Sequence, residues 1–256
     1  MHPFTLERPR DLTAALALRA QAGRNDAPAE YIAGGTDMVQ LLQEYVRRPE
    51  RLVSLAGLLD NRIEVGPQGL RLGAAATMAE VAAHRAVIEG FPVISEALLN
   101  SVSPQVRNQA TMGGNLLQRT RCPYFRDVGY SECNKRTPGS GCAAIRGENR
   151  WHAVLGTSKN CIAAHASDLA VALVALEMDG GRIRHAHVAL GGVGTRPWRV
   201  PRVEAALAGA SLDPAVLRRA AALAAQGAHG YGHNDFKIEL MQRAIVRAVA
   251  TAGARA

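Results

Sequence analysis

Short segments with helical or strand periodicity follow one another along this chain, and the pattern predicts a mixture of both element types. Before residue 101 it predicts a helix from Asp11, a strand over 31–33, a helix over 38–45, a strand over 51–55, a hairpin from 63–65 and 70–72, and helices over 77–85 and 91–100. After residue 166 it predicts a helix over 168–176, a strand over 182–190, and helices over 203–207, 214–226 and 236–250.

The stretch Thr120–Arg150 differs from the rest of the chain in composition and pattern. It is rich in Pro, Gly, Arg and Asn and shows neither helical nor strand periodicity. An irregular segment of this length inside a compact domain is uncommon and normally needs an organising centre of its own. A bound metal centre would supply one.

Four cysteines fall in or next to this stretch: Cys122, Cys133, Cys142 and Cys161. They are separated by ten, eight and eighteen residues, so the paired short spacings of zinc ribbons and ferredoxins are missing. The spacing alone leaves an iron–sulfur cluster, a zinc site, and free or disulfide-bonded cysteines open. His165 lies near Cys161, and we interpret it as a loop histidine.

The formal net charge of +8 raises the question of nucleic acid as a partner. The Lys and Arg residues are scattered on helix faces, however, and no basic run has interleaved aromatic residues. We therefore expect no nucleic-acid binding. No apolar run approaches the length of a membrane span, so no membrane insertion is expected. Because the N-terminus lacks a secretory pattern, we expect assembly in the cytoplasm, with export only alongside a signal-bearing partner.

Two glycine pairs interrupt the periodic pattern. The first follows a strand and precedes a helix, in the segment Ile32-Ala33-Gly34-Gly35-Thr36-Asp37-Met38. Glycines allow a close approach of the backbone to a ligand, and a helix N-terminus favours a pyrophosphate. The spacing differs from GxGxxG, and a plain strand-to-helix turn capped by Thr36 or Asp37 is the alternative.

The second glycine pair lies in Asn108–Leu116, with Thr111 before Gly113-Gly114 and Asn115 after it. The Thr111 hydroxyl and the Asn115 amide could hold phosphate or ribitol oxygens. Two such turns in one domain indicate a flavin or nucleotide held between subdomains. The sequence contains no GxSxG or HExxH motif and no independent acid–base pair, which favours an electron carrier.

Together these segments resemble the flavoprotein subunits of the molybdenum hydroxylases, the xanthine dehydrogenase and carbon monoxide dehydrogenase medium-chain family. The resemblance lies in Ile32–Met38, Val106–Leu116, Ser167-Asp168 and Leu190–Val193. It implies an α+β fold in which a two-lobed FAD-binding domain (1–181, with lobes 1–57 and 58–181) precedes a C-terminal domain (182–256). The FAD-binding residues that it implies are Ile32, Ala33, Gly34, Gly35, Thr36, Asp37, Met38, Thr111, Gly114, Asn115, Leu117 and Asp168.

The cysteine-containing insertion, residues 119–161, narrows the resemblance to the flavin subunits of bacterial periplasmic aldehyde oxidoreductases. This implies a [4Fe–4S] cluster on Cys122, Cys133, Cys142 and Cys161, with Arg121, Arg126, Lys135 and Arg136 offsetting its charge. The chain departs from the family in one respect. Family members carry several tens of residues between the Ser-Asp helix and the Gly-Gly-Val strand, whereas here residues 168–190 join directly.

The resemblance implies an electron-transfer subunit of a molybdenum-dependent aldehyde or xanthine-type oxidoreductase. Its partners would be a molybdenum cofactor-binding large subunit and a [2Fe–2S] small subunit, and electrons would pass through FAD to an external acceptor. The alternative is a non-catalytic binding module stabilised by zinc on the four cysteines.

Overall fold

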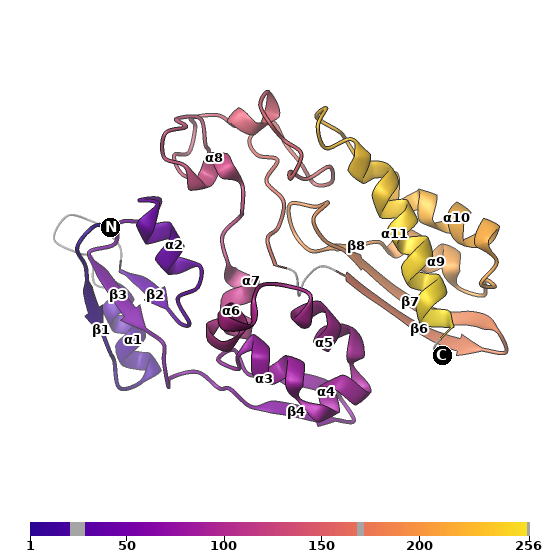
Figure 1. Cartoon of the computed structure of the whole chain (residues 1–256), viewed down its shortest axis with the longest axis horizontal. Coiled ribbons are helices and arrows are strands. Elements are labelled where there is room, and N and C mark those ends of the chain that lie inside the picture. Colours follow the sequence, from indigo (N-terminus) through magenta and orange to yellow (C-terminus); the bar gives the residue numbers. More distant parts are fainter. Residues whose placement is uncertain (21–28, 168–171, 255–256) are drawn as a thin grey trace. The chain divides into compact units, whose positions relative to one another are not determined.

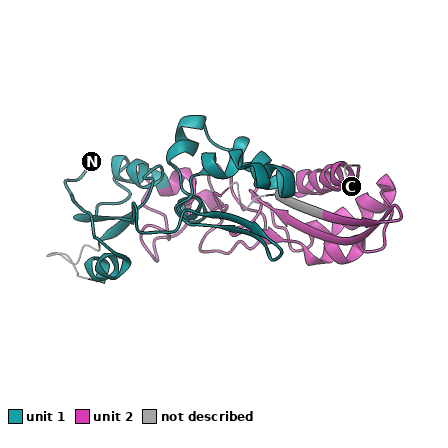
Figure 2. Cartoon of the chain, turned by 90° about the horizontal axis from the view of Figure 1, so that it is seen from below, with its two compact units in different colours: residues 1–119, 126–129 teal, residues 120–125, 130–256 magenta. Residues whose placement is uncertain are grey.

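The computed structural model describes residues 1–20, 29–167 and 172–254. It divides into two compact units, one comprising residues 1–119 and 126–129 and the other comprising 120–125 and 130–256 (Figure 2). This division follows packing, and the domain boundary at residue 181 stays a prediction. The elements of each unit combine helices and strands (Figure 1), so the α+β prediction is confirmed.

The first unit begins with a small parallel sheet in the order β1-β3-β2. Its strands are β1 (Thr5–Glu7), β2 (Glu30–Ile32) and β3 (Arg51–Ser54). Helix α1 (Leu12–Ala20) packs on it through Ala15, which joins Ala29 and Val53 in a buried cluster. Because β2 and β3 are parallel, their carboxyl ends open at the same edge, where ligands of parallel sheets commonly bind.

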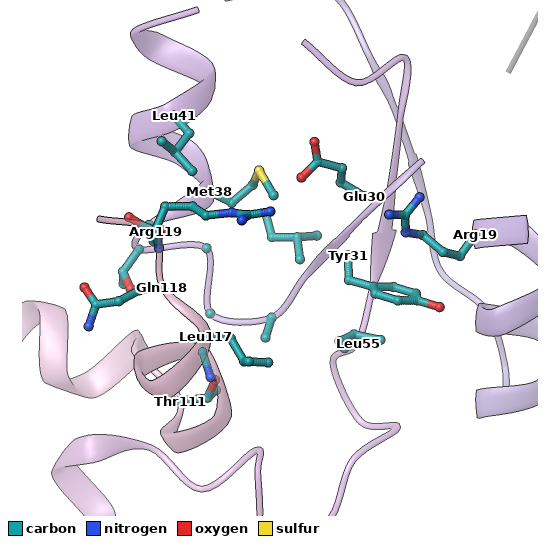
Figure 3. Close-up of a pocket in the computed structure, with 17 residues that line it drawn as sticks. Arg19, Glu30, Tyr31, Met38, Leu41, Leu55, Thr111, Leu117, Gln118 and Arg119 are labelled. Carbon is teal, nitrogen blue, oxygen red and sulfur yellow. Dashed lines mark hydrogen bonds between the residues drawn. The ribbon is translucent and has the colours of Figure 1, made fainter. Parts of the chain in front are cut away.

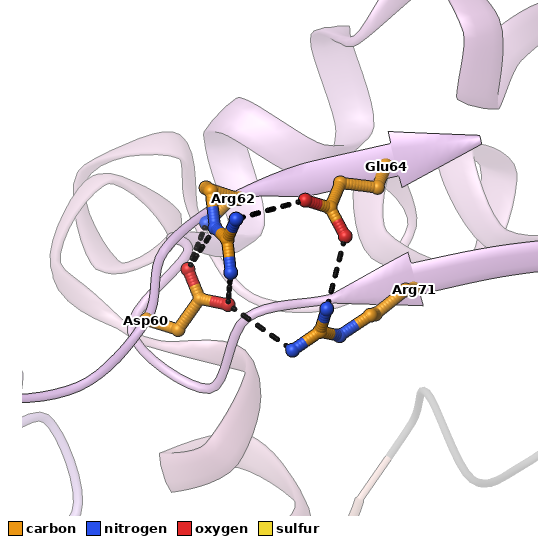
Figure 4. A network of polar contacts seen from close by, with 4 residues as sticks. All are labelled: Asp60, Arg62, Glu64 and Arg71. Atoms are coloured by element: carbon orange, nitrogen blue, oxygen red, sulfur yellow. Dashed lines mark hydrogen bonds and ion pairs between the residues drawn. The ribbon is translucent and has the colours of Figure 1, made fainter.

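An antiparallel hairpin follows, formed by β4 (Ile63–Gly66) and β5 (Gly69–Leu72). Four charged side chains form a ring of ion pairs on it (Figure 4). Arg62 lies 2.9 Å from Asp60 and 3.2 Å from Glu64, and Arg71 lies 3.2 Å from Glu64. Hydrogen bonds from Arg62 lower the pKa of Asp60 to about 2. Because the four side chains are largely solvent-exposed, their ion pairs contribute little to the free energy of unfolding of the unit. They mainly fix the side-chain conformations on the hairpin.

Short helices complete this unit: α2 (Met38–Gln43), α3 (Met78–Ala83), α4 (Arg85–Gly90), α5 (Pro92–Leu99), α6 (Pro104–Gln109) and α7 (Met112–Leu117). A reciprocal capping box begins α3. The Thr77 hydroxyl accepts from the Glu80 N–H at 3.1 Å, and the Glu80 carboxylate accepts from the Thr77 N–H at 2.8 Å. These contacts lower the pKa of Glu80 and fix the start of the helix.

Replacing Thr77 with alanine should therefore destabilise the chain by about 1 kcal/mol, because the first turn of α3 loses its cap. Chemical denaturation followed by circular dichroism measures the change. Thr13→Ala is the matched control, since Thr13 is exposed within α1 and its replacement should change stability by less than about 0.5 kcal/mol. Equal effects of the two changes would contradict the capping argument.

The second unit contains an antiparallel sheet in the order β6-β7-β8, formed by β6 (Ala172–Asp179), β7 (Arg182–Leu190) and β8 (Trp198–Arg199). Helices α9 (Pro201–Leu207), α10 (Pro214–Ala222) and α11 (Phe236–Gly253) lie together against it (Figure 1). Its core joins Ile183 of β7 with Val203, Leu217 and Ile245 of the three helices. None of the helices in the described part of the chain is long and apolar enough to cross a bilayer.

The predicted helix over 168–176 is wrong from residue 172 onward, because Ala172–Asp179 forms strand β6. β6 pairs with β7 from Ala172↔Leu190 to Asp179↔Arg182, with a bulge between Glu177 and Met178. The turn between the strands is Gly180-Gly181, at φ +53° and +78°. Residues 168–171 lie outside the described residues. The predicted start of that helix, and the first part of the directly joined segment 168–190, therefore lie outside them as well.

The irregular character of Thr120–Arg150 is confirmed. Its only regular elements among the described residues are α8 (Pro123–Arg126) and a short 3-10 turn, η1 (Ala143–Ile145). Isolated bridges connect Cys133 with Cys142 and Ser158 with Cys161. The backbone thus folds back on itself near each of these three cysteines.

Candidate functional site

A cavity of about 420 Å³ opens in the first unit where β2 and β3 end (Figure 3). It is lined by Arg19, Glu30, Tyr31, Ile32, Ala33, Gly34, Gly35, Thr36, Asp37, Met38, Leu41, Leu55, Thr111, Gly114, Leu117, Gln118 and Arg119. Both glycine motifs therefore line the same cavity, although more than seventy positions separate them in sequence.

The first glycine pair is fixed by two different constraints. Gly35 lies at φ +76°, in the left-handed region that other residues rarely adopt. Gly34 lies against the end of α6, and a Cβ atom there would be 1.7 Å from the Gln109 carbonyl oxygen. The loop consequently presents backbone, without intervening side chains, at these two positions.

The second glycine motif is held by its own threonine. The Thr111 hydroxyl accepts from the Gly114 N–H at 3.1 Å and so caps α7. A Cβ atom at Gly113 would lie 3.1 Å from the Ala74 side chain, so this glycine serves packing. Because its oxygen is the acceptor in this contact, the Thr111 hydroxyl could still donate its own hydrogen to a ligand.

Asp37 takes the N-cap position of α2, but its side chain makes no capping hydrogen bond. Its carboxylate accepts instead from the Arg119 N–H at 2.8 Å and pairs with the Arg126 guanidinium at 2.6 Å. The side chains of Asp37 and Arg126 are 17% and 14% exposed. Asp37 is therefore the N-cap residue by position, but its carboxylate does not cap the helix, and Arg126 offsets its negative charge next to the cavity.

A second, small cavity lies in the second unit and is lined by all four cysteines, with Lys135 and His152 among their neighbours. The four sulfur-bearing residues thus converge although they span forty positions of sequence. Within the described residues, no group of three or more His, Cys, Asp or Glu side chains is arranged around a single metal ion. In a cubane cluster each cysteine binds a different iron, which spreads the sulfurs more widely than one ion does.

Hydrogen bonds link the thiols to one another and to the surrounding backbone. The Cys161 thiol donates to the Cys142 sulfur, which lowers the pKa of Cys142 and raises the pKa of Cys161. Burial raises the pKa of Cys122 to about 11. The Ala163 N–H donates to the Cys161 sulfur at 3.5 Å. In a cluster, iron would take the place of the thiol hydrogens.

The basic residues expected around the cysteines divide into two groups. Lys135 lines the cysteine cavity, and its charge favours the thiolate of Cys161. Arg126 pairs with Asp37, and Arg136 donates to the carbonyls of Tyr124 and Phe125 at 2.8 and 3.0 Å. Arg126 is therefore neutralised by Asp37 and does not line the cysteine cavity. Arg136 holds the backbone of Tyr124 and Phe125, which do line it, so its contribution to the charge stays a prediction, as does that of Arg121.

The model of the FAD binding domain in molybdopterin dehydrogenase matches residues 2–179, and that of the CO dehydrogenase flavoprotein C-terminal domain matches residues 161–252. The chain belongs to this flavoprotein family. It is thus the FAD-binding subunit of a molybdenum hydroxylase-type oxidoreductase. The two matches overlap on residues 161–179, the segment in which the resemblance predicts additional residues in other family members.

Curated relatives support the same family. The chain is 44% identical to the aldehyde oxidoreductase FAD-binding subunit PaoB of Escherichia coli, over 84% of this chain and 68% of PaoB. It is 27% identical to the carbon monoxide dehydrogenase medium chain of Afipia carboxidovorans, over 99% of this chain and 98% of the relative. That alignment spans 290 positions, so the relative carries residues that this 256-residue chain lacks.

The fold is also that of solved family structures. The CO dehydrogenase from Oligotropha carboxidovorans superposes with a TM-score of 0.71 at 20% identity, and each chain is covered completely. Quinoline 2-oxidoreductase from Pseudomonas putida gives a TM-score of 0.70 at 20% identity, over 99% of this chain and 98% of the other.

Most of the FAD-binding residues implied by the family resemblance line the glycine-containing cavity. Asn115 is the exception among the described residues: its buried side chain donates to the Met78 sulfur at 3.5 Å and does not line the cavity. Asp168 lies outside the described residues. The lining residues that sequence reasoning missed are Arg19, Glu30, Tyr31, Leu41, Leu55, Gln118 and Arg119.

Two buried polar residues were also missed, one that contacts a cysteine and one that contacts the backbone of the first. The Nε2 atom of His152 lies 3.1 Å from the Cys122 sulfur, and burial lowers the pKa of His152. The Lys237 ammonium donates to the carbonyls of His152 and Gly192 at 2.9 and 2.6 Å. Burial lowers the pKa of Lys237 to about 8. No sequence motif indicated either residue.

Proposed function

We propose that this chain binds FAD in the glycine-lined cavity and a [4Fe–4S] cluster on its four cysteines. It would pass electrons from a [2Fe–2S] subunit to an external acceptor within a molybdenum-dependent aldehyde oxidoreductase. The observation that carries the flavin part is the shared cavity of two glycine motifs. The similarity to an aldehyde oxidoreductase subunit supports an aldehyde as the substrate of the assembly.

The glycine-lined cavity fits FAD because its loops leave room for a ligand to contact backbone. Gly34 and Gly35 would hold the pyrophosphate through their N–H groups, with those of Thr36 and Asp37 beside them. Thr111 and Gly114 would face the same ligand from the second motif. Arg126 neutralises Asp37, which otherwise would repel the phosphates. Leu55, Met38 and Leu117 provide apolar walls.

The cysteine cavity fits a cluster by its donor set and its charge. Four thiols meet there, and a [4Fe–4S] cluster takes one thiolate on each iron. The anionic cluster would be offset by Lys135 at the cavity and by the buried ammonium of Lys237 behind His152. In the described contacts the Lys237 ammonium donates only to carbonyls. A nearby negative group would lower the free-energy cost of burying this charge.

When bound, the flavin exchanges electrons with its partners singly or in pairs, and the cluster exchanges them singly. The chain itself contributes position and surroundings. Its glycine loops hold the flavin at the end of the parallel sheet. Its insertion shields the sulfurs, since Cys133 is 8% exposed and Tyr124 and Phe125 beside Cys122 are buried.

The visible spectrum of the purified complex, with iron and acid-labile sulfide analysis, tests this proposal. We expect flavin bands on a broad iron–sulfur absorption, with about four irons and four sulfides in excess of the [2Fe–2S] content. A chain with about one zinc, no sulfide and no flavin would instead establish the alternative, a zinc-stabilised binding module.

The chain should not act alone, because a flavin without a substrate-oxidising centre needs partners close enough to exchange electrons. We expect a stable heterotrimer with a molybdenum cofactor-binding subunit and a [2Fe–2S] subunit, assembled in the cytoplasm and exported, if at all, with a signal-bearing partner. Native mass spectrometry of the protein purified from its host measures this. Recovery of a lone monomer from that host would contradict it.

A further inference from the structure

A buried histidine touches one of the four proposed cluster ligands. The Nε2 atom of His152 lies 3.1 Å from the Sγ atom of Cys122, thirty positions away in sequence. The His152 side chain is only 2% exposed, so water does not compete for this contact. The contact forms only when the insertion folds. A histidine at position 152 is needed neither to bind the cluster nor to shield it from water.

The backbone around His152 is firmly held. The Lys237 ammonium donates to the His152 carbonyl at 2.9 Å, and the Asn234 amide donates to the same oxygen at 3.4 Å. The His152 N–H donates to the Asn149 carbonyl at 2.8 Å. The Tyr124 ring packs beside the imidazole, at 6.1 Å between centroids. These contacts hold the imidazole against the sulfur.

The surroundings of His152 also indicate which of its two ring nitrogens bears the hydrogen. The Nδ1 atom is buried, and no hydrogen-bond partner for it occurs in the described part of the chain. A neutral imidazole has one N–H, and burying that N–H without an acceptor costs free energy. The hydrogen therefore belongs on Nε2, facing the sulfur. An iron-bound thiolate carries no hydrogen and can only accept.

We propose that His152 donates an N–H···S hydrogen bond to the Cys122 thiolate and thereby raises the reduction potential of the cluster. The inference rests on the proposed function, since it requires a cluster on Cys122. Reduction adds negative charge to the cluster and its ligands, and a donor aimed at a ligand sulfur stabilises that charge. Hydrogen bonds to the sulfurs are among the factors that set such potentials. His152 is thus a tuning residue that acts through the ligand.

The test uses the intact complex with His152→Phe and His152→Gln, and an EPR-monitored redox titration of the [4Fe–4S] signal. We expect a lower potential for His152→Phe, which has no donor. His152→Gln should retain most of the native potential, because its amide can donate. His165→Phe is the matched control: His165 is a partly buried histidine of the same unit that does not line the cysteine cavity, so its replacement should leave the potential unchanged.

A His152→Phe complex with full iron and sulfide and a native potential would overturn the inference. If the unsubstituted complex has no iron and sulfide beyond its [2Fe–2S] content, the proposed function is overturned instead. If His152→Phe does not assemble, pulsed EPR of the unsubstituted complex labelled with ¹⁵N-histidine tests for the hydrogen bond instead. A weak ¹⁵N coupling to the reduced cluster is expected, and its absence would also overturn the inference.

Discussion

Replacing Gly35 with valine should leave the complex assembled but depleted of FAD. A Cβ atom at this position has room, since its nearest neighbours would be Ile32 and Val39 side-chain atoms at 3.4 and 3.5 Å. The cost lies in the backbone, because φ is +76° and a β-branched residue is strained there by about 1–3 kcal/mol. The loop would relax and its N–H groups would leave the proposed pyrophosphate position. We expect at least about tenfold weaker FAD binding, equivalent to about 1.4 kcal/mol.

Flavin content after desalting, followed by titration with added FAD, measures this loss. Gly209→Val is the matched control, because Gly209 has φ +75° and no atoms within 4 Å of an added Cβ, and it lies in the other unit. It introduces the same backbone strain away from the cavity and should retain flavin. Full flavin occupancy in Gly35→Val would show that this loop is not the pyrophosphate site.

Replacing Cys133 with serine should remove most of the iron and acid-labile sulfide of the proposed [4Fe–4S] cluster. Cys133 is the most buried of the four cysteines, and its backbone bridges that of Cys142. A serine hydroxyl is a much poorer ligand for iron than a thiolate. Since metal binding couples to folding, the insertion should also become sensitive to proteases. Iron and sulfide analysis and limited proteolysis measure the two effects.

Ser131→Ala is the control for this change, because Ser131 is exposed two positions before Cys133 and does not line the cysteine cavity. It should keep its iron, its sulfide and its resistance to proteolysis. Cys133→Ser protein with unchanged iron and sulfide would contradict the assignment of Cys133 as a ligand, whatever the state of the other three cysteines.

Elements with clear local signals could be predicted from the sequence. The predicted helices over 77–85, 91–100 and 236–250 correspond to α3, α5 and α11, whose starts lie within one residue of the expected positions. Strand β6 could not be predicted correctly, because a short, uniformly apolar run is equally consistent with a buried helix and a buried strand. Gly180-Gly181 was the better signal, since a glycine pair before a second strand is typical of a hairpin.

The candidate site shows the same division between local and tertiary information. The glycine motifs could be predicted because the positive φ of Gly35 and the Thr111 cap of α7 are local features. Gly34 and Gly113 are required by contacts with Gln109 and Ala74 that only tertiary folding creates. Asn115 could not be placed, because its position inside the fold depends on the packing of α7 against Met78. Tertiary folding brings His152 to Cys122 and Lys237 to the backbone of His152, so neither contact could be predicted from periodicity or spacing.

The Gly180-Gly181 turn also bears on how the second unit folds. Two successive residues at positive φ match the type I′ turn, whose twist suits a hairpin and which glycines adopt without strain. The hairpin formed by β6 and β7 requires closure of only a two-residue loop, and isolated hairpins form in about 1–10 μs. The contacts of this hairpin with α9 and α11 join residues farther apart in sequence and close larger loops, at a greater entropic cost. We therefore expect folding to start at this hairpin, with α9, α10 and α11 condensing onto it and the cysteine insertion ordering last.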